Sequence, residues 1–139
     1  MLLDTHVWIW AAEGLARLGA RTRRQLNKAS RGLPGELLVS SVSAFEIASL
    51  STAGRIRFSQ PVDRWIRETI ERGNLRVVDL ERDIAVDAGA IPTTALPDPF
   101  DRCLVATARE YGLPFVTCDR RILDYAKRTG LVTVIDASV

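Results

Sequence analysis

Short apolar runs alternate with stretches of helical periodicity along the whole chain. The apolar runs predict strands, and the stretches between them repeat apolar residues at three- and four-residue intervals, as amphipathic helices do. The predicted strands are residues 1–3, 37–40, 75–80, 114–117 and 131–135. The predicted helices are residues 7–12, 20–29, 43–53, 62–73, 81–90, 99–111 and 119–128.

Five strands interleaved with helices are typical of an α/β fold. The pattern predicts a three-layer α/β/α domain whose mainly parallel sheet of about five strands is covered on both faces. The 139 residues fit one domain, residues 1–139, and no internal repeat, low-complexity segment or linker divides them. In such sheets a ligand site forms beyond the carboxyl ends of the strands.

Two helix starts carry clear capping signals. Ser43 is a good N-cap, with Glu46 at the third helical position of a capping box and Gly54 as the stop. Asp98 is a second N-cap, and Pro99 fills the first helical position after it. We therefore expect these two helices to begin next to Ser43 and Asp98.

Four acidic residues fall at the predicted site end of the sheet. Asp4 follows the first strand, Glu46 lies on the helix after the second, Asp119 follows the fourth, and Asp101 lies in the first turn of the helix that enters the fourth. At an effective dielectric of about 20, two like charges roughly 4 Å apart repel by about 4 kcal/mol, so a carboxylate cluster takes up protons, spreads or binds a cation. Hard oxygen ligands favour Mg²⁺ or Mn²⁺.

Each acid also has a purely structural interpretation. Asp4 and Asp119 could cap the helices that follow them, and Glu46 could be a capping-box partner or a solvated helix residue. Asp98 is explained by its cap, and Asp101 could back-cap the same turn. The functional interpretation therefore rests on the joint placement of the acids.

Composition sets the remaining limits. The chain has 19 Lys and Arg against 17 Asp and Glu, so four acids gathered in one site would leave a more basic surface, with room for a phosphate-bearing partner. Cys103 and Cys118 belong to no metal-binding motif and are interpreted as core residues in a reducing cytosol. No apolar run reaches the roughly 18 residues of a membrane span, and the N-terminus lacks a signal-peptide pattern, which predicts a cytoplasmic protein.

The other candidate side chains are less specific. His6, the only histidine, is interpreted as packed or solvated, because no Ser or Cys constellation supports a catalytic triad. Trp8 and Trp10 lie on the apolar first helix and are interpreted as packing in the core or at a dimer contact rather than as base-stacking residues. Arg102 and Arg120 flank the acids and are either phosphate-binding groups or solvated residues.

Four stretches follow one another along the chain: Leu-Leu-Asp-Thr-His-Val-Trp at 2–8, Val-Ser-Ser-Val-Ser-Ala-Phe-Glu-Ile-Ala at 39–48, Asp-Pro-Phe-Asp-Arg at 98–102, and Phe-Val-Thr-Cys-Asp-Arg at 115–120. In this order and spacing they together resemble a PIN domain, most closely the VapC toxin branch of type II toxin–antitoxin systems. The sequence differs from the branch in carrying Leu96-Pro97 instead of His-Arg, and Phe45 and Ser49 instead of Trp and Lys. These differences affect substrate docking more than metal binding.

The resemblance implies a function as well as a fold. It implies an endoribonuclease that depends on Mg²⁺ or Mn²⁺, cleaves RNA phosphodiesters, forms a homodimer and is silenced by a cognate small antitoxin. The four acids of the family correspond to Asp4, Glu46, Asp101 and Asp119, and Asp98 belongs to the variant motif of this branch.

The chemistry of such a site needs few protein groups. Mg²⁺ keeps several waters and can orient one for in-line attack on a phosphodiester, so no side-chain nucleophile is required. We expect Asp4, Glu46 and Asp101 to be the principal ligands and Asp119 to support the same or a second ion. Thr5 and Thr117 could orient these carboxylates or act as local caps. The remaining alternative is a non-catalytic module on the same scaffold that binds nucleic acid or protein.

Overall fold

The computed structural model describes residues 1–33 and 35–139 and has the predicted α/β architecture. Its strands form one parallel sheet in the order β3-β2-β1-β4-β5, so the first strand lies at the centre. The strands are β1 (Leu2–Leu3), β2 (Leu37–Ser40), β3 (Leu75–Val78), β4 (Phe115–Thr117) and β5 (Val134–Asp136).

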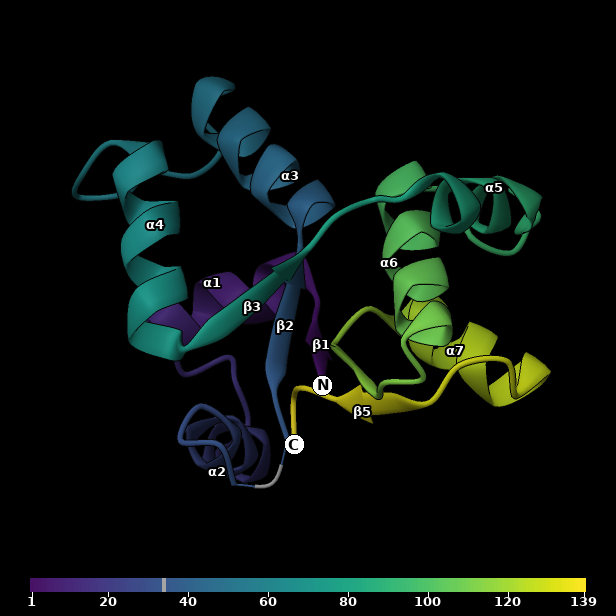
Figure 1. Cartoon of the computed structure of the whole chain (residues 1–139), viewed down its shortest axis with the longest axis horizontal. Helices are drawn as coiled ribbons and strands as arrows, with labels where there is room; N and C mark the ends of the chain where they lie inside the picture. Colours follow the sequence, from purple (N-terminus) through teal and green to yellow (C-terminus); the bar gives the residue numbers. More distant parts are fainter. Residues whose placement is uncertain (34) are drawn as a thin grey trace.

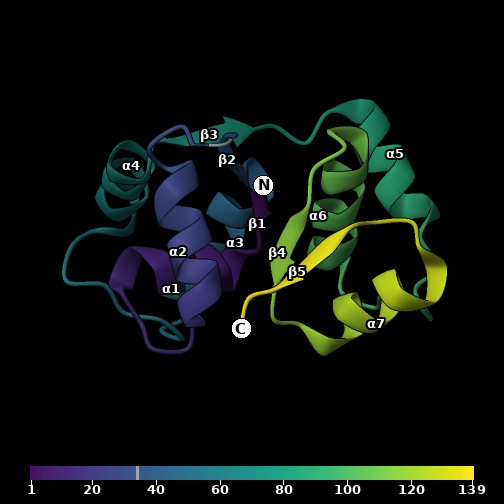
Figure 2. The same ribbon diagram turned by 90° about the horizontal axis from the view of Figure 1, so that it is seen from below.

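Helices cover both faces of this sheet (Figures 1 and 2). On one face lie α1 (Thr5–Glu13), α2 (Ala20–Ala29) and α4 (Val62–Gly73), and α3 (Ser41–Thr52) continues from the end of β2 above them in Figure 1. On the other face lie α5 (Arg82–Ala90), α6 (Pro99–Glu110) and α7 (Arg120–Thr129). These are the three layers that the alternating pattern predicts.

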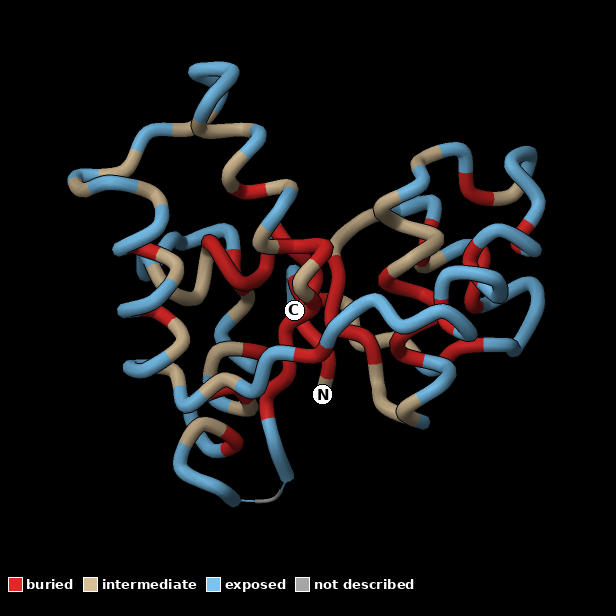
Figure 3. The backbone as a smooth tube through the Cα atoms, turned by 45° about the horizontal axis from the view of Figure 1, so that its top comes forward, coloured by how far each residue is buried: buried red, intermediate tan, exposed pale blue. Residues whose placement is uncertain are grey.

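The alternation of side chains along each strand divides the core into two clusters. Leu2 packs with residues of α6 and α7, whereas the next residue, Leu3, packs with residues of α1, α2 and α4. Phe115 and Val116 of β4 divide between the two clusters in the same way. Because both faces are covered, the central strands are buried along their length, as the red centre of Figure 3 shows.

Several strand and helix bounds differ from the sequence-based ones. The helix at 20–29 and the strand at 37–40 agree with the structure, but the strand predicted at 131–135 is displaced to Val134–Asp136. This strand pairs residue by residue with Phe115–Thr117, so its position is set by a partner in another part of the chain. The strand predicted at 75–80 ends at Val78, which pairs with the last residue of β2.

The predicted start of α3 is wrong. Ser40 is the N-cap, since its side-chain oxygen accepts a hydrogen bond from the backbone N–H of Val42, and the helix begins at Ser41. Ser43 is therefore buried inside the helix, and Glu46 lies too far along α3 to complete a capping box. The strand runs directly into the helix without a loop, which moves the cap three residues towards the N-terminus.

Of the other local predictions, the cap at Asp98 is confirmed and the interpretation of the cysteines is not. Asp98 caps α6 with Pro99 at the first helical position, as predicted. Cys103 and Cys118 are only partly buried, so their interpretation as core residues is wrong: each packs at the margin of an apolar cluster. None of the helices within residues 1–33 and 35–139 has both the length and the apolar character needed to cross a membrane.

Candidate functional site

The four predicted acids lie at the carboxyl end of the sheet, after its central strand and on either side of that strand. Asp4 directly follows β1, Asp119 follows β4, and Glu46 lies on α3, which continues from β2. Asp101 lies in the first turn of α6, on the opposite layer. The two layers also meet at α3 and α6, where the rings of Phe45 and Phe100 lie 5.7 Å apart between centroids.

Asp4 is the most buried of these acids, and both of its carboxylate oxygens accept hydrogen bonds. Its side chain is the N-cap of α1, where Oδ1 accepts from the backbone N–H of Thr5 at 2.7 Å. Oδ2 accepts from the hydroxyl of Thr117 at 2.6 Å, so β4 fixes the orientation of the carboxylate. The cap and the functional interpretations are therefore compatible, because one geometry serves both.

The burial of Asp4 raises the pKa of its carboxyl above the ordinary value, and the nearby charge of Glu46 acts in the same direction. The hydrogen bonds from Thr117 and Thr5 and the proximity of His6 oppose this rise, because they favour the ionised form. A buried acid that is held in a fixed orientation and surrounded by further acids binds a cation readily, since the cation replaces the lost hydration.

Thr5 contributes a contact that the sequence did not indicate. Its hydroxyl donates a 2.9 Å hydrogen bond to the side-chain oxygen of Ser43, and both residues are fully buried. This bond fixes the rotation of α3 relative to α1. Glu46 lies three residues after Ser43, on the same side of the helix, and its charge is near enough to Asp4 to raise the pKa of that carboxyl. No local pattern distinguishes Ser43 from its neighbouring serines.

Asp119 has a structural partner of its own. Its Oδ1 caps α7 by accepting from the backbone N–H of Arg121 at 2.7 Å. Its own backbone N–H donates to the Thr117 hydroxyl at 3.0 Å, and that hydroxyl in turn donates to Asp4. Thr117 therefore connects two of the acids through one buried hydroxyl, which sequence analysis suggested only as an orienting role.

The charges of all the other acids of this cluster affect the pKa of Asp101. Partial burial of its carboxyl is the main cause that raises its pKa to about 7, and the charges of Asp98, Asp4, Asp119 and Glu46 raise it further. The acids therefore share one electrostatic environment although they come from four distant parts of the sequence. Near neutral pH this carboxyl is poised between its two protonation states.

The acids do not form a closed ligand cage. Within the described residues, no three His, Cys, Asp or Glu side chains are arranged to hold a metal ion by themselves. Mg²⁺ suits such an open arrangement, because it usually binds one or two carboxylates and fills its remaining positions with waters and phosphate oxygens. The donor set, made only of carboxylates, fits this ion or Mn²⁺ better than a soft metal.

The two candidate arginines differ in their surroundings. Nη1 of Arg102 donates to the backbone carbonyls of Leu96 and Pro97, at 3.0 and 3.3 Å, and so holds the loop before α6. Arg120 is exposed at the first position of α7, directly after Asp119. Arg102 is therefore engaged with the backbone, whereas Arg120 is exposed beside one of the acids.

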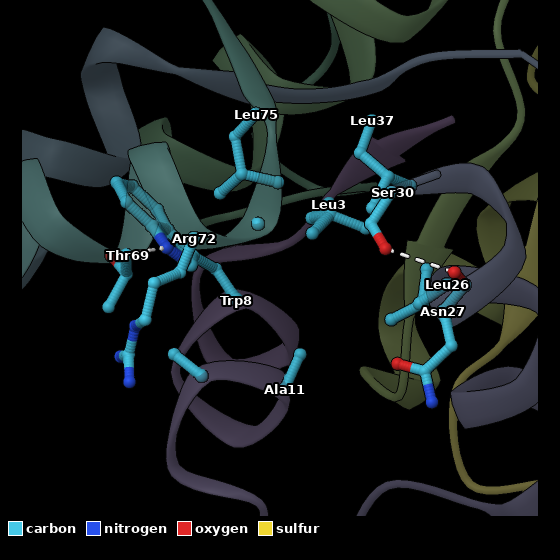
Figure 4. Close-up of a pocket in the computed structure, with 12 residues that line it drawn as sticks. Leu3, Trp8, Ala11, Leu26, Asn27, Ser30, Leu37, Thr69, Arg72 and Leu75 are labelled. Atoms are coloured by element: carbon cyan, nitrogen blue, oxygen red, sulfur yellow. Dashed lines mark hydrogen bonds between the residues drawn. The ribbon is translucent and has the colours of Figure 1, made fainter. Parts of the chain in front are cut away.

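A separate cavity lies on the far side of α1 and plays no part in this cluster. It has a volume of about 280 Å³ between α1, α2 and α4, and Figure 4 shows Trp8 in its wall. The indole N–H of Trp8 donates to the Thr69 hydroxyl at 3.1 Å. None of the residues that line this cavity is acidic, so it is not part of the acidic site, and the exposed Asn27 and Arg72 in its lining place it at the surface.

The fold and the acidic cluster together define a class of protein. The PIN domain family matches residues 1–128, and the chain belongs to this family. The family resemblance seen in the sequence is thereby confirmed. A relative of known name is Ribonuclease VapC22 of Mycobacterium tuberculosis, which is 35% identical over 122 residues, 88% of each chain.

Solved structures show the same fold at lower identity. A chain in the crystal structure of VapBC2 from Rickettsia felis, bound to a DNA fragment from its promoter, has a TM-score of 0.69 and 13% identity, over 97% of this chain and 96% of that one. A chain of VapBC-1 from nontypeable Haemophilus influenzae has a TM-score of 0.65 and 16% identity, over 99% and 98% of the two chains. The three-layer fold predicted from the sequence is therefore that of the family.

Proposed function

We propose that this protein is an endoribonuclease that cleaves RNA phosphodiesters with Mg²⁺ or Mn²⁺, and that it is the toxin of a toxin–antitoxin pair. The observation that carries the proposal is the environment of Asp101, whose pKa is raised to about 7 by burial and by four other acids. The ribonuclease name of the 35% identical relative supports RNA as the substrate.

The acids Asp4, Glu46, Asp101 and Asp119 would hold the ion. A divalent ion supplies the positive charge that activates water and balances the charge developing on the phosphate. The protein's own contribution is positional: Thr117 and the N–H of Thr5 hold Asp4, and Ser43 and Thr5 hold the helix that carries Glu46. Asp98 keeps Asp101 at the start of α6 by capping that helix.

An antitoxin is the partner that we propose for this site. One solved relative, from Klebsiella pneumoniae, is described as a toxin–antitoxin complex, with a TM-score of 0.62 and 19% identity. A partner segment that presents Arg or Lys to the four acids would replace the metal charge, and a guanidinium could pair bidentately with one carboxylate. We also propose that the protein acts in the cytoplasm as a homodimer of one-domain chains.

A cleavage assay tests the enzymatic part of the proposal. Purified protein is incubated with cellular RNA in Mg²⁺, in Mn²⁺ and in excess chelator, and the new RNA ends are sequenced. We expect specific ends with either metal, none in chelator, and none with Asp101→Asn. The matched control is Asp124→Asn, which removes the same charge from an exposed position of α7. Undiminished specific cleavage in chelator would rule the mechanism out.

Expression in cells tests the toxin part. Wild type should arrest growth and be rescued by a small protein encoded beside it, whereas Asp4→Asn at matched levels should not arrest growth. Equal toxicity from the two would show that harm does not come from metal-dependent cleavage, and would favour a binding module on the same scaffold.

A further inference from the structure

A groove of about 850 Å³ adjoins the acidic site. It runs between α1 and α3, which lie against each other, and continues to the loops that follow these helices. Glu46 and Leu50, one turn apart on α3, form one wall, so the groove begins at a site acid and follows the helix away from it. The other wall carries Trp10 of α1, and the two following loops contribute Arg17 and Arg55.

Trp10 presents an aromatic surface in this groove. Trp8 and Trp65 are almost completely buried, whereas Trp10 keeps part of its surface accessible. The ring of the exposed His6 lies 6.2 Å from it, centroid to centroid, and lines the same groove. The sequence predicted that Trp10 packs in the core or at a dimer contact; it does pack against the core cluster, and the part of its surface that stays accessible lines the groove.

Arg17 and Arg55 supply positive charge beside this aromatic surface. Both are exposed, and the ion pairs among the described residues involve neither of them. An arginine held in an acidic pair has part of its charge balanced, whereas these two guanidinium groups remain available to an anion. The groove therefore combines stacking surface and cationic charge, the two features of sites that bind single-stranded nucleic acid.

We propose that this groove binds the RNA strand next to the phosphate that is cleaved. Trp10 stacks on a base, Arg17 and Arg55 hold the neighbouring phosphates, and the strand continues past Glu46 to the acids. This inference rests on the proposed function and adds to it a binding track that carries two further arginines.

The charges favour RNA over a protein partner as the occupant. A partner that inhibits by presenting Arg or Lys to the acids would bring like charges close to Arg17 and Arg55, which is unfavourable at an interface. An RNA strand gains from both regions, because its phosphates meet the arginines in the groove and a divalent ion at the acids. An aromatic ring beside arginines adds stacking that depends little on base identity.

The first test measures RNA binding without cleavage. The probe is a fluorescein-labelled 12-nucleotide single-stranded RNA of mixed sequence, titrated with the full chain in chelator and followed by anisotropy. Arg17→Gln/Arg55→Gln is compared with Arg109→Gln/Arg128→Gln, which removes the same charge from exposed positions of α6 and α7. We expect the groove variant to bind at least about 10-fold more weakly than the control. The slope of its log association constant against log salt concentration should also fall in magnitude by about 1.4, because two phosphate contacts are lost.

The second test uses the tryptophan itself. Since Trp8 and Trp65 are buried, RNA that stacks on Trp10 should quench its part of the intrinsic fluorescence. Trp10→Phe should abolish the RNA-dependent quenching and weaken binding of the same probe, while its circular dichroism and melting temperature show that it is folded. Quenching of equal size in Trp10→Phe would overturn the stacking assignment.

The outcomes separate this inference from the function on which it rests. If wild type cleaves RNA with Mg²⁺ but the two double-arginine variants bind the probe equally, the groove proposal is wrong and the nuclease proposal stands. If wild type binds the probe through the groove but never cleaves, the nuclease proposal fails alone. If the groove variant loses only its antitoxin and keeps full RNA affinity, the groove is a protein interface and the inference is overturned.

Discussion

The hydroxyl of Thr117 donates a 2.6 Å hydrogen bond to Oδ2 of Asp4, although 113 positions separate the two residues in the sequence. The same hydroxyl accepts the backbone N–H of Asp119 at 3.0 Å. One buried threonine therefore aligns an acid of the central strand with the acid that follows the neighbouring strand. This arrangement makes Thr117 a positioning residue with measurable consequences.

Replacing Thr117 with Val keeps the shape of the side chain and removes its hydroxyl. The carboxylate of Asp4 then stays buried with one hydrogen bond fewer, which should cost about 1–3 kcal/mol of the free energy of unfolding. The pKa of Asp4 should also rise, because the Thr117 bond favours its ionised form. We expect weaker metal binding and slower cleavage at pH 7, measured by calorimetry and by RNA cleavage. Thr117→Ser is the control, and a Val variant as active as the Ser variant would contradict this role.

The metal-free protein should lose stability as pH rises from about 4 to about 7. The pKa of Asp101 is about 7 in the folded state against an ordinary 3.8, so the folded protein keeps a proton that the unfolded chain has released. The buried Asp4, whose pKa is also raised, acts in the same direction. Urea denaturation in chelator at several pH values measures how the free energy of unfolding changes with pH. Asp101→Asn should weaken this pH dependence and Asp124→Asn should not. An equal pH dependence in both variants would refute the raised pKa of Asp101.

Metal should reverse this pH dependence. A divalent ion that binds only the folded state raises the melting temperature, and it competes with protons for the same carboxylates. We therefore expect millimolar Mg²⁺ to raise the melting temperature more at pH 8 than at pH 6, with protons released on binding. Scanning calorimetry at the two pH values is the measurement. A shift that is absent, or that is unchanged in Asp101→Asn, would count against a metal at these acids.

Asp98 and Asp101 should behave differently although they share one helix start. Asp98 accepts the backbone N–H of Phe100 at 2.8 Å, so Asp98→Ala should cost about 0.5–2 kcal/mol of stability and leave appreciable cleavage. Because the charge of Asp98 raises the pKa of Asp101, its removal should also shift the pH profile of cleavage to lower pH. Asp101→Asn should abolish cleavage in a folded protein. A pH profile left in place by Asp98→Ala would contradict the coupling.

The general plan of the fold could be predicted because it depends on local patterns. Apolar runs and amphipathic periods gave α2 and β2 with their observed bounds, and Asp98-Pro99 gave the start of α6. The start of α3 could not be predicted, because three serines within four residues can each cap a helix and only the position of β2 selects Ser40. The bounds of β5 failed for a similar reason, since β4 sets them.

The proximity of the four acids could be predicted from the sequence, but the side-chain contacts that hold them could not. Asp4, Glu46, Asp101 and Asp119 could be grouped because each follows or flanks a strand end of a parallel sheet. The bond between Thr5 and Ser43 could not, because it joins helices 38 positions apart through side chains that have many possible partners. The partial exposure of Trp10 in the groove could not be predicted, because an apolar helix gives no sign of which ring is left partly at the surface.

The central place of β1 in the sheet has a consequence for protein synthesis. This two-residue strand is translated before the other strands of the sheet, yet one of its neighbours in the sheet is β4, whose residues follow more than a hundred positions later. At synthesis rates of roughly 5–20 residues per second, that interval is on the order of ten seconds. A growing chain therefore carries Asp4 without Thr117 or Asp119, and it has no assembled acidic site. The acidic site therefore cannot assemble until Asp119 has left the ribosome.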